Sequence, residues 1–422
     1  MTRHGLVGKG GPVGTRNPFV FLLAHPGFGL FWCARGASSL AFQMQAVAVG
    51  WQIYALTHST LKLGLVGLAQ FLPMVLCTLP AGHVADRYDR RWVAGAMVAL
   101  QGLAIGFLAW GSHGGWLTTR MIFTAVAVIG AARAFERPAT QALLPALIPA
   151  EEFPKALAWS TSAFQAASIA GPALGGFLYA WGPAHGYAIA AALGLAGSLL
   201  LARIRLDHAE RPRPAATLAS LFSGIHYIRG NPVILGSVSL DLFAVLLGGA
   251  TALLPAFARD VLHTGAWGLG ALRAAPALGS LAMSGFLMLR PLRRRVGRSM
   301  FGAVFAFGLA TVVFGLSHSF PLSFAALVLL GAADTVSVVV RSSLVQLQTP
   351  DVMRGRVSAV NGLFIGTSNQ LGEFESGLTA SWFGTVPATV LGGVGTIVVG
   401  LLWMRFFPAL RTCDRLDVKS SS

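Results

Sequence analysis

The chain has 422 residues, of which 55% are hydrophobic and only 11% charged, and its formal net charge is +16. Soluble globular domains carry about 25% charged residues, so this composition excludes a soluble fold and indicates membrane-spanning segments. The positive charge does not indicate nucleic-acid binding, because the basic residues lie in short loops between apolar runs. The three cysteines are scattered and show no disulfide or metal-binding spacing.

The hydrophobic pattern predicts an all-α membrane protein with about twelve transmembrane helices. Several apolar runs exceed the roughly 20 residues that a span needs, so these helices must tilt or bend. Prolines predict bends at Pro73, Pro138, Pro172, Pro255 and Pro276. In chain order, the spans are expected at about 28–56, 61–85, 92–112, 117–148, 155–181, 185–204, 232–259, 265–290, 298–317, 321–348, 355–383 and 386–408.

The distribution of Lys and Arg predicts the orientation. Three of the 31 lie in loops on one side: Lys62, Arg120 and Arg259. Five lie inside spans: Arg35, Arg133, Arg137, Arg273 and Arg341. All the others fall on the side that holds both termini, which predicts a multi-pass protein of a bacterial cytoplasmic (inner) membrane with both termini in the cytoplasm.

The chain also repeats itself. Residues 130–178, shifted by 201 positions, match 331–379 without a gap, so that Gly171 and Gly176 fall on Gly372 and Gly377. Many transporters are built from such parallel repeats, with the substrate site where the two halves meet. The predicted parts are a cytoplasmic tail (1–27), a six-helix bundle (28–204), a cytoplasmic linker (205–231), a second pseudo-symmetric six-helix bundle (232–408) and a cytoplasmic tail (409–422).

The linker contains apolar residues at helical spacing, namely Leu218, Leu221, Phe222, Ile225 and Ile228. This spacing predicts a short amphipathic helix lying on the inner membrane surface. A plain linker without regular structure is the alternative.

A dense group of charges, Gly82–Arg91, separates two long apolar runs. Its arginines, Arg87, Arg90 and Arg91, are expected to stay on the cytoplasmic side and contact lipid phosphates. Asp86 stands near a helix end, where a carboxylate can accept hydrogen bonds from a helix N-terminus or an arginine. Anchoring of the topology alone would require the cations but would not explain the acid.

These residues carry a resemblance to a known family. Gly82-x-x-x-Asp86-Arg87-x-x-Arg90-Arg91 resembles the signature loop of the major facilitator superfamily. Gly171-Pro172-x-x-Gly175-Gly176 resembles its antiporter motif, although Ala158 and Ala167 stand where the family pattern has two further glycines. The pattern around Arg35 and the runs at 49–59 and 347–361 are similar to the drug:proton antiporter-3 group, which includes exporters of enterobactin and of macrolides.

The resemblance implies the major facilitator fold and a conformational latch that stabilises the outward-open state. The latch residues would be Gly82, Asp86, Arg87, Arg90 and Arg91. The second-half copy of the loop keeps Gly285 and Arg290 but has Leu289 where the first half has Asp86. The basic anchor is therefore duplicated and the acid is not, which predicts a one-sided latch.

Ionisable residues inside spans are rare because each costs about 2.5–3.5 kcal/mol at a helix centre on insertion scales. Arg133, Glu136 and Arg137 share one helix face, and Asp334 occupies the repeat position of Arg133. Arg341 follows Asp334 by seven residues on the same face. Structural ion pairs between helices are the alternative to a functional role.

Three acids are the candidates for proton coupling, because a carboxylate removed from water takes up a proton more readily; they are Asp241, Asp334 and Glu373. Polar residues inside spans also suit a substrate cavity, although they can equally connect helices. The cavity candidates are Arg35, Gln45, Gln52, Arg133, Glu136, Arg137, Arg341, Asn361, Asn369 and Gln370.

The sequence thus favours a secondary active transporter that works by alternating access. We expect efflux of a small amphipathic, drug-like or siderophore-like compound in exchange for protons, by a monomer that contacts membrane lipids and no nucleic acid. No phosphate-binding loop or metal motif is present, so we expect no cofactor and no enzymatic activity. Uptake or lipid flipping on the same scaffold remains open, as does, more remotely, a membrane sensor or enzyme.

Overall fold

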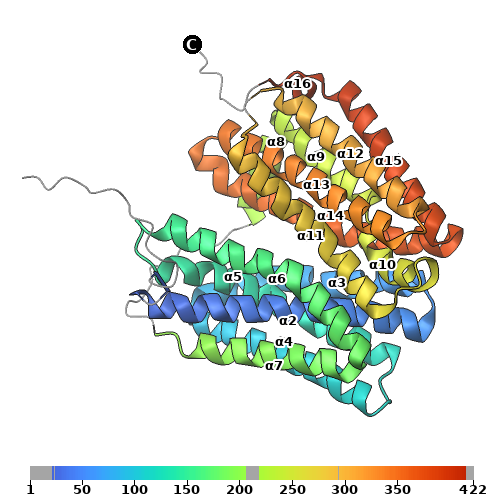
Figure 1. Cartoon of the computed structure of the whole chain (residues 1–422). Helices are drawn as coiled ribbons and strands as arrows, with labels where there is room; N and C mark the ends of the chain where they lie inside the picture. The colour runs from blue at the N-terminus through green and yellow to red at the C-terminus, as the bar shows by residue number, and fades with distance from the viewer. Residues whose placement is uncertain (1–20, 23, 206–217, 293, 415–422) are drawn as a thin grey trace, which may run out of the picture.

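The computed structural model describes residues 21–22, 24–205, 218–292 and 294–414, and the described part is helical with no strand. Twelve long helices in this part form two bundles of six, one from each half of the chain (Figure 1). The predicted all-α, two-bundle fold is therefore confirmed. The exact boundaries of the five predicted parts, and the cytoplasmic assignment of the linker and tails, stay predictions.

The first bundle follows the predicted spans closely. Its helices are α2 (Pro26–Thr57), α3 (Thr60–Arg87), α4 (Arg90–His113), α5 (Thr119–Leu143) with a 3₁₀ turn η1 (Leu144–Ala146), α6 (Phe153–Trp181) and α7 (Pro183–Ala202). Hydroxyl side chains cap two of the starts: Ser59 accepts from the Lys62 amide at α3, and Thr118 accepts from the Met121 amide at α5.

The second bundle has the same order but is interrupted in its first span. Its elements are α9 (Pro232–Leu247), η2 (Ala250–Leu253), α10 (Leu254–Ala256), the π-helical turn η3 (Phe257–Val261), α11 (Gly265–Leu289), α12 (Val296–Leu316), α13 (Phe320–Gln348), α14 (Asp351–Phe383), α15 (Thr385–Phe406) and the short α16 (Pro408–Arg411).

The break in this span lies at Gly248–Gly249 and not at Pro255, where the sequence predicted a bend. A Cβ atom on Gly248 would lie 2.5 Å from the ring of Phe307, and one on Gly249 would lie 2.5 Å from the carbonyl oxygen of Gly372. The two glycines therefore let neighbouring helices approach the backbone. Pro255 lies in the first turn of the next short helix, α10, where a missing amide costs nothing.

The sequence repeat corresponds to a repeated packing contact. Gly130 on α5 lies directly against the backbone of Gln70 on α3, and its repeat partner Gly331 on α13 lies against the backbone of Pro276 on α11. A side chain at either position would collide with that backbone. Glycine is thus retained where helices pack backbone to backbone.

Eight of the described helices are long and apolar enough to cross a membrane. The remaining long helices, α2, α5, α6 and α14, do not meet that measure because they are less apolar or more charged, and together they hold most of the candidate site residues. Large apolar side chains point outward from the bundles: Leu76, Trp181 and Met288 are 68%, 73% and 79% exposed. Such exposed apolar surface is expected of a protein in contact with lipid tails.

Helix α8 (Leu218–Gly230) confirms that the linker contains a helix, but its apolar face does not simply lie on a membrane. Ile228 is buried with Val357 and Val360 of α14. The hydroxyl group of Tyr227 donates to the carbonyl oxygen of Gln348 at 2.8 Å. The helix is therefore docked on the second bundle. The preceding part of the predicted linker lies outside the described residues.

Candidate functional site

The two bundles meet at one end of the molecule. Figure 1 shows them converging near α10 and lying apart toward the end that carries α8. The helix pairs α6 with α11 and α3 with α14 make the contact. At the first pair, a Cβ on Gly176 would lie 2.7 Å from the Cα of Gly270; at the second, a Cβ on Gly377 would lie 2.8 Å from the Cα of Gly64.

These two contacts are related by the internal repeat, since Gly377 is the repeat partner of Gly176. The glycines of the predicted antiporter-type motif contact two different helices, α2 and α11. Gly171 and Gly175 lie against Gln43 and Met44 of α2 within the first bundle, whereas Gly176 faces the second bundle. Pro172 adds its carbonyl oxygen to the contact with Gly270. The motif therefore forms part of the seam between the halves.

Two polar contacts also cross this seam, and sequence reasoning missed both. The guanidinium of Arg273 on α11 donates to the carbonyl oxygen of Ala46 on α2 at 3.1 Å. The hydroxyl of Tyr54 on α2 donates to the carboxylate of Asp260 in η3. The partners are more than 200 positions apart in the sequence, and no local pattern signals the pairing.

Glu373, a predicted proton-coupling residue, lies at the same seam on α14. A Cβ on Gly67 of α3 would lie 2.7 Å from its Oε2 atom, so the carboxylate is packed against the opposite bundle. Arg273 is close enough to interact with Glu373 electrostatically. Glu373 is thus positioned to respond to separation of the halves.

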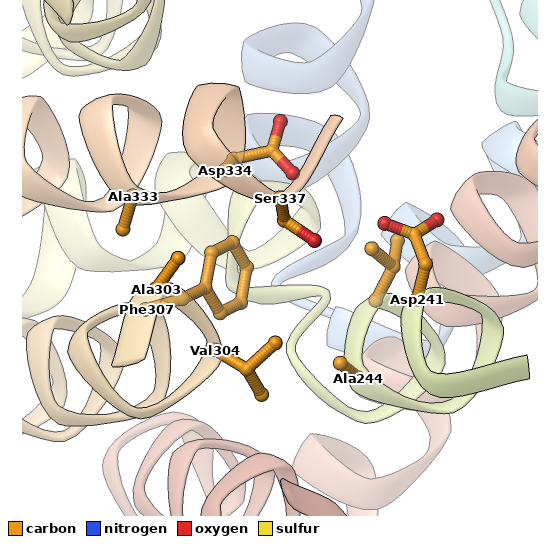
Figure 2. A pocket seen from close by; sticks show the side chains of 9 residues that line it. Asp241, Ala244, Ala303, Val304, Phe307, Ala333, Asp334 and Ser337 are labelled. Carbon is orange, nitrogen blue, oxygen red and sulfur yellow. The ribbon is translucent and has the colours of Figure 1, made fainter. Parts of the chain in front are cut away.

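A small pocket lies among α9, α12 and α13 of the second bundle (Figure 2). Its free interior has room for about one water molecule. Asp241 and Asp334 stand on two of its walls, with the hydroxyl of Ser337 between them in this view. The remaining lining is largely apolar: Ala244, Val245, Ala303, Val304, Phe307 and Ala333.

Asp241 is not the isolated acid that its own helix predicts. It forms an ion pair with Arg341 of α13, and the two residues are only 5% and 1% exposed. Arg341, predicted to line a substrate cavity, is therefore a partner of a proton-coupling candidate. Its Nε atom is buried without a hydrogen-bond partner in the described part of the chain.

Asp334 is half-buried and takes part in no ion pair among the described residues. It shares the pocket with Asp241 and lies seven residues before Arg341 on α13. The second bundle therefore contains one buried ion pair and one additional acid at the same pocket.

A cluster of mostly basic side chains lies between α2 and α5 of the first bundle. Arg35 on α2 and Arg133, Glu136 and Arg137 on α5 are close enough to interact electrostatically. The Arg133 guanidinium stacks 3.6 Å above the centre of the Phe42 ring. The structure thus brings four of the predicted cavity residues together on the facing sides of two helices.

The predicted amides have different surroundings. Gln52 is held within the first bundle, where its Nε2 donates to Ser112 at 3.1 Å and its Oε1 accepts from the Tyr187 hydroxyl at 2.8 Å. Both ends of its side-chain amide are therefore used within the first bundle. Gln45 is buried. Its Oε1, like Asn361 Oδ1 and Gln370 Oε1, finds no hydrogen-bond partner in the described part; Asn369 is exposed.

The predicted latch loop is only partly described, because the side chain of Asp86 lies outside the described residues. The acid that the structure does show is Asp89, which sequence reasoning did not single out. It accepts from the amide of Arg91 at 3.0 Å and from its Nε at 2.8 Å, and Arg91 also donates to the carbonyl oxygen of Ile204 after α7. Asp89 thereby caps α4.

Burial acts to raise the pKa of Asp89, but the hydrogen bonds and charge of Arg91 outweigh it and hold that pKa below its ordinary value. Gly82, predicted as part of the latch, makes no close contact: no atom of the described residues would lie within 4 Å of a Cβ there. The same holds for Gly285, its counterpart in the second half. At the C-terminal ends of α3 and α11, Gly82 and Gly285 therefore make no close contact with other described residues.

The chain matches the family model described as transmembrane secretion effector over residues 19–422. It is 31% identical to the enterobactin exporter EntS of Citrobacter koseri and 30% identical to that of Shigella dysenteriae, in each case over 92% of this chain and 94% of the relative.

Solved structures share the fold at low identity. A bacterial homologue of the human lysosomal transporter Spinster, in an inward-facing and unoccupied conformation, has a TM-score of 0.69 at 15% identity, covering 92% of this chain and 96% of that one. The POT family transporter PepTSo has a TM-score of 0.73 at 12% identity, covering 92% of this chain and 99% of that one. The relatives and fold neighbours are transporters and not enzymes. With its two six-helix bundles, the chain therefore belongs to the transmembrane secretion effector family of major facilitator transporters.

Proposed function

We propose that this multi-pass transporter exports a small amphipathic, siderophore-like molecule from the cytoplasm in exchange for protons. The relatives named as enterobactin exporters support the direction and the kind of cargo. We further propose that the protein works as a monomer in a bacterial inner membrane, among lipids, with both termini in the cytoplasm, since the basic residues concentrate on that side.

One observation carries the mechanism. The repeat-related glycine contacts Gly176–Gly270 and Gly377–Gly64 close the halves at one end, while Gly82 and Gly285 make no close contact with any described residue at the other. Close packing of the two halves at one end, with no such glycine contact among the described residues at the other, supports alternating access by rocking of two rigid bundles. In the proposed cycle, Gly82 and Gly285 pack when Gly64 and Gly270 separate.

The second bundle supports the proton step. We propose Asp334 as the main proton acceptor, because Asp241 already pairs with Arg341. Glu373 is the second candidate, since its carboxylate lies at the seam that must open. Each proton that moves down a membrane potential releases about 2.3 kcal/mol per 100 mV, which can supply the energy for export.

The test uses inside-out vesicles from a bacterial strain that lacks its own siderophore exporters, with enterobactin as the probe. An acidic vesicle interior should drive enterobactin accumulation that a protonophore abolishes. Accumulation only in right-side-out vesicles would instead indicate uptake. Accumulation that persists without a proton gradient would refute proton coupling.

The same assay tests the proposed acids. Asp334→Asn and Glu373→Gln should each reduce gradient-driven accumulation by about tenfold or more, which corresponds to about 1.4 kcal/mol. Glu375→Gln is the matched control, because Glu375 shares α14 but already accepts a hydrogen bond from Thr379 at 2.7 Å. If Asp241→Asn, Asp334→Asn and Glu373→Gln all left the accumulation intact, the assignment would be wrong.

A further inference from the structure

A cluster of arginines between α2 and α5 has more positive charge than its surroundings balance. Arg35 and Phe42 are seven residues apart on one face of α2, and Arg133 and Arg137 are four apart on one face of α5. Glu136 is the one acid that acts electrostatically on Arg35 and Arg133 among the described residues. Three guanidinium groups thus share one carboxylate.

That carboxylate does not form an ion pair with any of them in the described part of the chain. Its Oε1 instead accepts a hydrogen bond from Thr140 at 3.2 Å, one turn further along α5. Arg35 Nε is buried and has no hydrogen-bond partner among the residues that the structure describes. One face of the Arg133 guanidinium is covered by Phe42. The donors of this cluster are therefore largely unused by the protein itself.

Unbalanced charge within the spans is costly, so it is expected to meet a partner at some stage of the protein's cycle. The residues are reachable: Arg137 is exposed, and Arg35, Arg133 and Glu136 are half-buried. The repeat sharpens the argument, because Asp334 stands at the position of Arg133 in the second bundle. The two halves therefore place opposite charges at equivalent depth.

We propose that Arg35, Arg133 and Arg137 bind the acidic group of an organic anion, and that the substrates of this transporter are acids. A guanidinium matches the two oxygens of a carboxylate, and its stacking on Phe42 fixes the orientation of its N–H groups. The inference rests on the proposed transport function but concerns a different property, namely which charge the substrate carries.

The experiment measures equilibrium binding to the purified full-length protein in uncharged detergent, by isothermal titration calorimetry and without any proton gradient. Three probes of nearly equal shape differ only in charge: 1-naphthoate, 1-naphthamide and 1-naphthylmethylammonium. The anion should bind at least about tenfold more tightly than the neutral amide, and the cation more weakly still. Raising the salt concentration should weaken binding of the anion alone.

Arg35→Gln and Arg133→Gln should each weaken naphthoate binding by about tenfold or more while changing naphthamide binding by less than about twofold. Arg133→Lys keeps the charge and should retain most of the preference for the anion, which separates loss of charge from loss of folding. Arg120→Gln is the matched control, since Arg120 is an exposed arginine at the opposite end of α5; it should leave all three affinities unchanged.

Equal or tighter binding of the cation would overturn the proposal, as would an anion preference that survives both Arg→Gln substitutions. Failure of the proposed transport function is distinguishable, because enterobactin accumulation in vesicles can lose its dependence on the proton gradient while the naphthoate preference persists.

Discussion

The buried ion pair between Asp241 and Arg341 makes a quantitative prediction. Both side chains are almost inaccessible, at 5% and 1% exposure, so removing one partner leaves an uncompensated charge inside the second bundle. Such single substitutions cost about 3–5 kcal/mol, whereas replacing both partners by neutral groups is often nearly neutral. We expect Arg341→Gln and Asp241→Asn each to fall in that range and the double variant to cost less than either.

The assay is a double-mutant cycle of unfolding free energies in detergent, followed by circular dichroism as sodium dodecyl sulfate is added. The coupling energy between the two substitutions should reach about 3 kcal/mol or more, far above the roughly 0.5 kcal/mol within which independent sites add. Asp334→Asn is the matched control, because it changes an acid of the same pocket that has no ion pair in the described residues; it should cost less than about 1 kcal/mol. Additive single effects would refute the reasoning that the pair acts as one unit.

Three further predictions follow from the seam, the capped loop and the first bundle. Gly377→Ala places a methyl group 2.8 Å from the backbone of Gly64, so it should separate the two bundles at the contact of α3 with α14. A cysteine introduced at Ser376 should then be labelled faster by a thiol reagent. Gly82→Ala, where no described residue lies within 4 Å of the new Cβ, should not change that labelling. Asp89→Ala should lower the free energy of unfolding by about 1 kcal/mol through loss of the helix cap, and Asp89→Asn, which can still cap, by less. The pKa of Asp89 is lowered in the folded state, so its ionic contribution to stability is present above the ordinary aspartate pKa of about 3.9 and is lost as the pH falls through the folded-state pKa. The unsubstituted protein and the Asp89→Asn variant should therefore converge in stability at acidic pH. Gln52→Leu leaves the Tyr187 hydroxyl and Ser112 unpaired, and it should lower the unfolding free energy by about 1–3 kcal/mol without changing naphthoate binding; unchanged stability would contradict the structural role.

Much of the architecture was predictable from the sequence, because a bilayer leaves the chain few options. Backbone groups in lipid must be satisfied within helices, so runs of apolar residues predicted most of the long helices to within a few residues, although not the break in the first span of the second bundle. The repeat at a shift of 201 predicted two equivalent halves, and it pointed to Gly171 and Gly176, which do lie at helix contacts. The arginines on α5 were also predicted as a group, because their spacing on one helix decides their common face.

The pairings between helices were decided only by the tertiary structure. Asp241 and Arg341 are 100 positions apart, and Arg273 meets the carbonyl of Ala46 across the two bundles. An amide on an apolar helix suits a substrate cavity and a contact between helices equally well, so the sequence alone did not reveal that Gln52 bonds to Ser112 and Tyr187. Helical periodicity tells which residues share a face, but the rotation and depth of each helix against its neighbours decide what that face meets. Those depend on packing over the whole bundle, and no local pattern in the chain records them.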